Sequence, residues 1–139
     1  MRLFILRLLI VSLAATVSAC SGLIDQFPTT PDPVITTDTF TGTLTVNGGA
    51  THPVFASATG QVVATLTSLG ENPPSKVGFS MGTLGVTGVC NIHLRNDNAV
   101  VNSALTGTVS SLGGSLCVSV YDTGAMSAPV DYTFTVSHP

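Results

Sequence analysis

The side chains that could act as a general base or bind a metal ion are few and widely spaced in this sequence. The histidines are His52, His93 and His138, and no two of them have the short spacing of metal ligands on one element. A serine nucleophile needs a neighbouring base, but no Gly-x-Ser-x-Gly elbow is present. Glu71 is the only glutamate, so few carboxylates could pair for glycoside hydrolysis. We therefore expect no catalytic site, with a hydrolase as a distant alternative.

An oxygen-rich stretch at Asn96, Asp97 and Asn98, together with Asp122, is the best candidate for a metal site. Ca²⁺ takes about six to eight oxygen ligands, which carboxylates and side-chain amides can supply. The alternative is that these residues cap turns through hydrogen bonds from side chain to backbone. The sequence favours turns, so we expect neither a bound metal ion nor another cofactor.

The first 20 residues have the three-part composition of a secretory signal. Arg2 and Arg7 supply positive charge, residues 3–13 are almost entirely apolar, and residues 14–19 are mostly small. An apolar run of about ten residues is too short for a mature transmembrane helix, which needs about 20. We expect residues 1–19 to form a helical signal that is cleaved from the mature protein.

The residues at the end of this signal are Val17, Ser18, Ala19 and Cys20. This stretch resembles the bacterial lipobox, which has an aliphatic residue, two small residues and an obligatory cysteine. The resemblance implies that the thiol of Cys20 receives diacylglyceryl, that cleavage occurs just before it, and that the new N-terminus is acylated with a fatty acid such as palmitate. Two or three acyl chains hold a protein on a membrane where one is marginal. The alternative is an ordinary signal peptide that happens to end near a cysteine.

The position after the lipidated cysteine carries Ser21. In the Gram-negative sorting rule, the absence of Asp at this position favours the outer membrane, so we expect a lipid-anchored protein of the cell envelope. Residues 20–37 are predicted to be a lipidated N-terminus and flexible linker, because Pro28, Pro31 and Pro33 favour extended, solvated backbone. The folded domain is then expected at residues 38–139.

Two further cysteines, Cys90 and Cys117, remain in the mature chain. An even number of cysteines in an exported protein indicates a disulfide. The alternative is two free or metal-bound thiols. It is disfavoured because no Cys-x-x-Cys pair or nearby histidine completes a metal site.

The charge of the mature chain excludes one class of ligand. Only Lys76 and Arg95 are basic once the signal has left, against seven acidic residues, which gives a net charge near −5. Nucleic-acid binding proteins typically neutralise about six or more phosphates. We therefore expect no nucleic acid among the partners.

From residue 38 onward the hydrophobic pattern has a period of two, which is typical of β-strands, and no amphipathic helical run interrupts it. Turn residues separate about eight such segments, which favours an antiparallel β-sandwich. Because the chain has no Trp and few other aromatic residues, we expect an aliphatic core. The predicted strands are 38–46, 53–57, 61–69, 76–85, 88–95, 99–110, 115–121 and 129–137.

Short pieces throughout this domain resemble the bacterial pre-peptidase C-terminal domain. They are Thr39 to Leu44, His52-Pro53, Gly60 to Val62, Thr65 to Leu69, Asn96 to Asn98, Leu105 to Gly107, Cys117 to Asp122 and Tyr132 to Val136. The resemblance covers residues 38–139 and implies a compact, jelly-roll-like β-sandwich. Such domains usually accompany secreted hydrolases as non-catalytic modules, and some members bind calcium in their loops. This chain differs in that no enzyme is attached.

Two classes of function remain open for the domain. The first is a non-catalytic binding or accessory module at the cell surface or in the periplasm, with a protein or polysaccharide as ligand. Sugar binding is the weaker form, because only Tyr121 and Tyr132 could provide stacking surfaces. The second is a purely structural envelope or assembly component.

Overall fold

The computed structural model describes residues 31–111 and 113–139. The predicted signal peptide (1–19), the lipidation site Cys20 and most of the predicted linker lie outside these residues. Residues Pro33–Pro139 form one compact unit, and its first strand begins at Thr36. Within the described part, no helix is long and apolar enough to cross a membrane.

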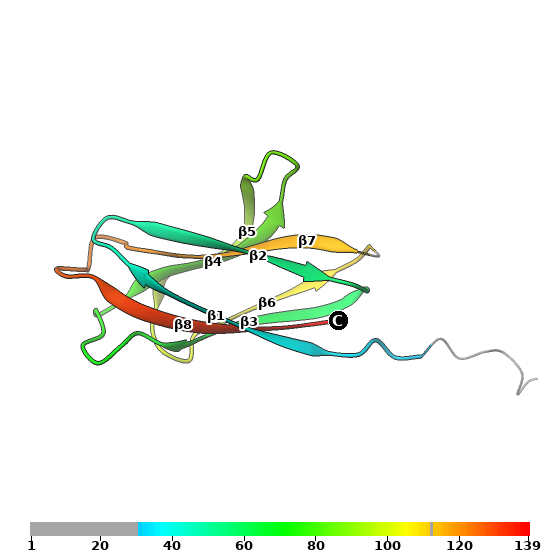
Figure 1. Cartoon of the computed structure of the whole chain (residues 1–139), viewed down its shortest axis with the longest axis horizontal. Helices are drawn as coiled ribbons and strands as arrows, with labels where there is room; N and C mark the ends of the chain where they lie inside the picture. The colour runs from blue at the N-terminus through cyan, green and yellow to red at the C-terminus, as the bar shows by residue number, and fades with distance from the viewer. Residues whose placement is uncertain (1–30, 112) are drawn as a thin grey trace, which may run out of the picture. The chain divides into compact units, whose positions relative to one another are not determined.

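This unit consists of β-strands that pair antiparallel in two four-stranded sheets (Figure 1). The prediction of an all-β antiparallel sandwich of about eight strands is therefore confirmed. The strands are β1 (Thr36–Leu44), β2 (Gly49–Ala56), β3 (Gly60–Ser68), β4 (Val77–Leu84), β5 (Cys90–Ala99), β6 (Ala104–Val109), β7 (Gly114–Tyr121) and β8 (Val130–His138).

The order of the strands is that of a jelly roll. One sheet has the order β1-β8-β3-β6 and the other has the order β2-β7-β4-β5. The first strand pairs with the last, the second with the seventh, the third with the sixth and the fourth with the fifth, as in a long hairpin rolled into two layers. The β4–β5 pair is therefore the tip of this hairpin.

The alternation of residue types along each strand determines which face enters the core. In β8, Tyr132, Phe134 and Val136 are buried, while Thr133 and Thr135 between them are partly exposed. Successive side chains of a strand point to opposite faces, so this pattern buries one face and leaves hydroxyl groups on the other. The inward orientation of these three side chains matches the sequence prediction.

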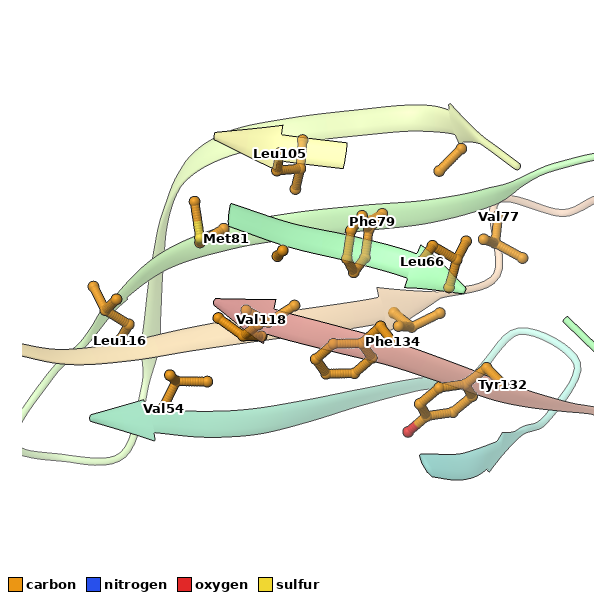
Figure 2. Packing of buried hydrophobic residues seen from close by; sticks show 14 of the residues in the cluster. Val54, Leu66, Val77, Phe79, Met81, Leu105, Leu116, Val118, Tyr132 and Phe134 are labelled. Atoms are coloured by element: carbon orange, nitrogen blue, oxygen red, sulfur yellow. The ribbon is translucent and has the colours of Figure 1, made fainter. Parts of the chain in front are cut away.

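The core is mainly aliphatic, as expected, and it contains a small aromatic cluster at its centre. Phe134 is fully buried, with its ring centroid 5.0 Å from that of Phe40 and 5.8 Å from that of Phe79. Figure 2 shows Phe134 between Tyr132 and the aliphatic side chains of the opposite sheet. Phe40, Phe79, Tyr132 and Phe134 thus form one cluster, whereas Phe55 is exposed on β2.

The β4–β5 hairpin bends away from its sheet and projects from the sandwich (Figure 1). We call residues 83–92 the arm. At its base, a Cβ on Gly82 would collide with the backbone carbonyl of Asn91, so only glycine permits the two strands to approach this closely. Val86 and Val89 in the arm are exposed. The sharp bend therefore depends on one residue without a side chain.

The predicted disulfide joins this arm to the body of the sandwich. Cys90 begins β5 and Cys117 lies on β7, with a Cα–Cα distance of 5.8 Å. The bond crosses over β4, because Cys90 pairs with Leu84 on one side of β4 and Cys117 pairs with Gly82 on the other. The disulfide thus holds the base of the arm against the outer face of β7.

Two local predictions are wrong. The Asn96–Asn98 stretch is not a turn between strands, because it lies inside β5, where the register with β4 shifts between the pairs Val77–Ala99 and Phe79–Asn96. Residues 99–110 do not form one extended segment either. A turn at 100–103 separates β5 from β6, and the backbone N–H of Ser103 donates to the carbonyl of Val100.

Candidate functional site

An apolar groove opens between the two sheets at the side of the sandwich formed by β5 and β6. It has a volume of about 290 Å³. Its walls carry no charged side chain in the described structure, and they come from β3, β4, β5, β6 and β7. The lining residues are Val62, Met81, Gly82, Thr83, His93, Leu94, Thr106, Gly107, Thr108, Val109 and Leu116.

The groove exists because β5 leaves the regular ladder of its sheet at His93. Met81 pairs with Leu94 and Gly82 pairs with Ile92, so His93 is an extra residue on β5. Such a bulge bends the strand and increases its twist. Because β5 turns away here, the edges of the two sheets do not close over Met81 and Leu116, which Figure 2 shows at one end of the core.

The rim of the groove carries a polar pair. The Nε2 atom of His93 lies 3.0 Å from Oγ1 of Thr83, and both side chains are exposed. Which of the two atoms donates depends on the tautomer of the imidazole. The groove therefore combines an apolar floor with a hydrogen-bonding rim, as in many ligand sites.

The second histidine, His52, is half-buried on β2 and packs beside the core. Its Nε2 lies 2.8 Å from the hydroxyl of Tyr132, and its ring packs 5.2 Å from those of Phe40 and Phe134. Burial lowers the pKa of His52 below the ordinary value of 6.5, because a charged imidazolium is poorly solvated there. A neutral imidazole that hydrogen-bonds to a tyrosine is a structural group in this position.

The lowered pKa of His52 predicts how stability depends on pH. Since the folded state holds this proton less tightly than the unfolded state, stability falls as the pH drops below 6.5 and levels off beneath the folded pKa. Urea unfolding between pH 7.5 and 5 measures this loss. His52→Gln, which does not titrate, is the control. An unchanged pH dependence in that variant would contradict the assignment.

The third histidine, His138, lies at the end of β8. Its Nε2 is 3.1 Å from Oδ2 of Asp38 on β1, and the carbonyl of the next residue, Pro139, accepts a hydrogen bond from the N–H of Ser57. These contacts hold the end of β8 against β1 and against Ser57, which follows β2. The structure therefore gives His52, His93 and His138 separate partners on different elements. Across the described residues it brings no three His, Cys, Asp or Glu side chains into a metal-binding group.

The candidate calcium ligands make hydrogen bonds within the protein. Arg95 Nε donates to Oδ1 of Asp97 at 2.8 Å, and the hydroxyl of Tyr121 donates to the same oxygen. These hydrogen bonds lower the pKa of Asp97. β5 has a second register shift, between Asn96 and Ala99, and there the N–H of Asn98 donates to Oδ1 of Asn96 at 3.0 Å. Asp97 thus belongs to a polar cluster with the guanidinium of Arg95 and the hydroxyl of Tyr121.

Asp122 follows β7 and holds the backbone of two loops. Its Oδ2 accepts the N–H of Asn47, and its Oδ1 accepts those of Gly124, Ala125 and Met126. These backbone donors lower the pKa of its carboxyl group. Asp122 thus has the side-chain-to-backbone hydrogen bonds of a turn cap, whereas Asn96 makes its bond inside β5.

The two tyrosines that could stack on a sugar ring are both covered. Tyr132 is 2% exposed and lies in the core. The ring of Tyr121 packs so closely on Gly78 that a Cβ there would collide with it, and the guanidinium of Arg95 lies 5.7 Å from its centroid on β5. Tyr132 is buried and Tyr121 is only partly exposed, so neither ring is a fully exposed stacking surface for a sugar.

The groove itself was not predicted from the sequence. Its floor residues appear in the sequence as ordinary inward positions of strands, and the one local signal is the cluster of Gly82, Gly85 and Gly88 before Cys90. Comparison with family models and with curated proteins gives no match for this chain. The resemblances to the lipobox and to the pre-peptidase C-terminal domain therefore stay predictions.

Proposed function

We propose that this chain is a lipid-anchored protein of the bacterial cell envelope whose β-sandwich is a non-catalytic binding module with a protein as its ligand. In this proposal Cys20 carries the lipid and residues 20–37 connect it to the sandwich. The outer membrane is the proposed location, because Ser21 follows the cysteine. The fold is compatible with this role, since a rigid sandwich can present a binding surface without any catalytic group.

The observation that carries the binding role is the groove beside β6. A volume of about 290 Å³ is close to the lower limit of about 300 Å³ for small ligand sites, and apolar walls favour an apolar group. Apolar side chains of a partner protein satisfy both conditions. A polysaccharide fits them poorly, and the covered rings of Tyr121 and Tyr132 point the same way.

Site-specific photo-crosslinking on intact cells tests the binding role. A photoreactive amino acid at Thr83 lies on the rim of the groove, whereas the same residue at Thr41 lies on the exposed face of β1, at the opposite edge of the sandwich. We expect a discrete protein adduct from position 83 and none from position 41. Adducts from position 41 alone, or binding to a glycan array without an adduct from position 83, would contradict the proposal.

A further inference from the structure

The two sheets together have four edge strands, which are β1 and β6 in one sheet and β2 and β5 in the other. An edge strand presents unpaired N–H and C=O groups that can pair with another chain. Proteins discourage such pairing with proline, charged residues, bulges or an inward-facing charge. The four edges of this sandwich differ in whether they have such a feature.

Three of the four edge strands have a feature that discourages pairing with another chain. Pro53 lies in the middle of β2 and has no N–H to donate. β5 carries the charged pair Arg95 and Asp97, and its ladder with β4 shifts register twice. In β1, Asp38 is on the inward-facing side of the strand, where it contacts His138. Each of these features opposes the addition of a further strand.

The β6 edge has none of them. Ala104–Val109 is uncharged, contains no proline, and pairs with β3 in an unbroken register. Leu105 and Val109 are buried on its inner face, while Thr106 and Thr108 are exposed on its outer face. It also forms one wall of the apolar groove. An added strand here would extend the β1-β8-β3-β6 sheet and place apolar side chains over the groove.

We infer that this added strand is β6 of a second copy of the chain, paired antiparallel about Gly107. This inference rests on the proposed function, because it names the protein partner that covers the groove. It makes the two β1-β8-β3-β6 sheets continuous across a two-fold axis. The interface is isologous, so it closes with two copies.

The sequence of β6 is complementary to itself in this register. Directly opposed residues of an antiparallel pair point to the same face, so Leu105 meets Val109 of the partner subunit, and Thr106 meets Thr108 of the partner subunit. The two-fold axis passes between the two opposed copies of Gly107. Apolar groups therefore face apolar groups on the groove side, and hydroxyl groups face hydroxyl groups on the solvent side. A register shifted by one residue would instead place Thr106 opposite a residue of the inner face.

Charge also favours a second copy at this edge. The described domain has more acidic than basic residues, so two copies repel each other over most of their surfaces. β6 and the groove carry no charged side chain, which makes this side the place where two copies can approach. A strand of six residues is about 20 Å long. Two such strands bury a small area compared with the roughly 1,200–2,000 Å² of a stable interface. We therefore expect a weak, concentration-dependent dimer.

Cysteine pairs test the inferred register in the full chain. In Thr106→Cys/Thr108→Cys, each new cysteine faces a new cysteine of the partner at a Cβ separation of about 4.5–5.5 Å, and a small movement of the two strands brings them to the separation of about 3.5–4.5 Å that a disulfide needs. The matched control is Thr39→Cys/Thr41→Cys, which has the same spacing on the exposed face of the opposite edge strand β1. Non-reducing electrophoresis of cells that produce either variant compares the two.

We expect a product of twice the monomer mass from the β6 variant and none from the β1 variant. Equal dimer from both variants, or no dimer from either, would overturn the inference. A crosslinked product of another mass would overturn it in favour of a foreign strand. The proposed function fails separately, if the photoreactive residue at Thr83 captures no protein at all.

Discussion

Removal of the Cys90–Cys117 disulfide is expected to lower the free energy of unfolding by about 3–4 kcal/mol. The two cysteines are 27 residues apart in the sequence, and the crosslink reduces the conformational entropy of the unfolded chain. In the folded state it also holds the base of the arm over β4. Urea unfolding of Cys90→Ala/Cys117→Ala measures the loss, and replacing both cysteines avoids a free thiol.

Treatment with a reductant provides the control for this prediction. It should destabilise the native chain by a similar amount and leave the double variant unchanged. Hydrogen exchange should accelerate in the arm (83–92) more than in β1 or β8, because the crosslink attaches to the arm, whereas β1 and β8 lie in the other sheet. A double variant within about 0.5 kcal/mol of the native stability would contradict this account of the disulfide.

Replacement of Phe134 by alanine is expected to destabilise the domain by about 3–5 kcal/mol. Phe134 is fully buried, and its ring packs against those of Phe40, His52, Phe79 and Tyr132. Its removal deletes these contacts and leaves a cavity between the sheets. Since a domain of this size has about 5–15 kcal/mol of stability in total, the variant should be close to unfolding at room temperature.

Phe55 is a matched control for this substitution. It has the same side chain on β2, but it is 60% exposed. Phe55→Ala should therefore change the free energy of unfolding by only about 0.5 kcal/mol. Equal losses for Phe134→Ala and Phe55→Ala in denaturant unfolding would show that the core is not organised around Phe134.

The strands of this fold could be predicted from the sequence because their pattern is local. Tyr132, Phe134 and Val136 alternate with polar residues, and such alternation requires one buried face. The strand order could not be predicted in the same way. β1 pairs with β8 across nearly the whole domain, from Thr36 with His138 to Leu44 with Val130. No short-range pattern encodes so distant a pairing.

The error at Asn96, Asp97 and Asn98 has a specific cause. Asn and Asp are rare in strands and common in turns, so local preference indicated a break in the chain. The register shift of β5 between Asn96 and Ala99 instead lets these side chains form hydrogen bonds within the sheet. The N–H of Asn98 donates to Asn96, and Asp97 accepts from Arg95 and Tyr121. These partners come from tertiary structure, which the local sequence does not show.

The groove could not be predicted from the sequence for a related reason. Met81, Leu94 and Leu116 have the pattern of core residues, and they line the groove at the place where β5 departs from its ladder at His93. The departure depends on the close approach of Asn91 to Gly82. A glycine and a histidine in a strand do not by themselves indicate an opening between two sheets.

We propose that a lipid on Cys20 holds the folded, non-catalytic domain at the cell envelope. The most direct test compares the native chain with Cys20→Ser in cells fed a labelled fatty acid, followed by fractionation. The account predicts that the native chain is labelled and sediments with membranes, whereas Cys20→Ser is unlabelled and its sandwich is soluble and folded. An unlabelled native chain, or a Cys20→Ser chain that still sediments with membranes, would contradict it.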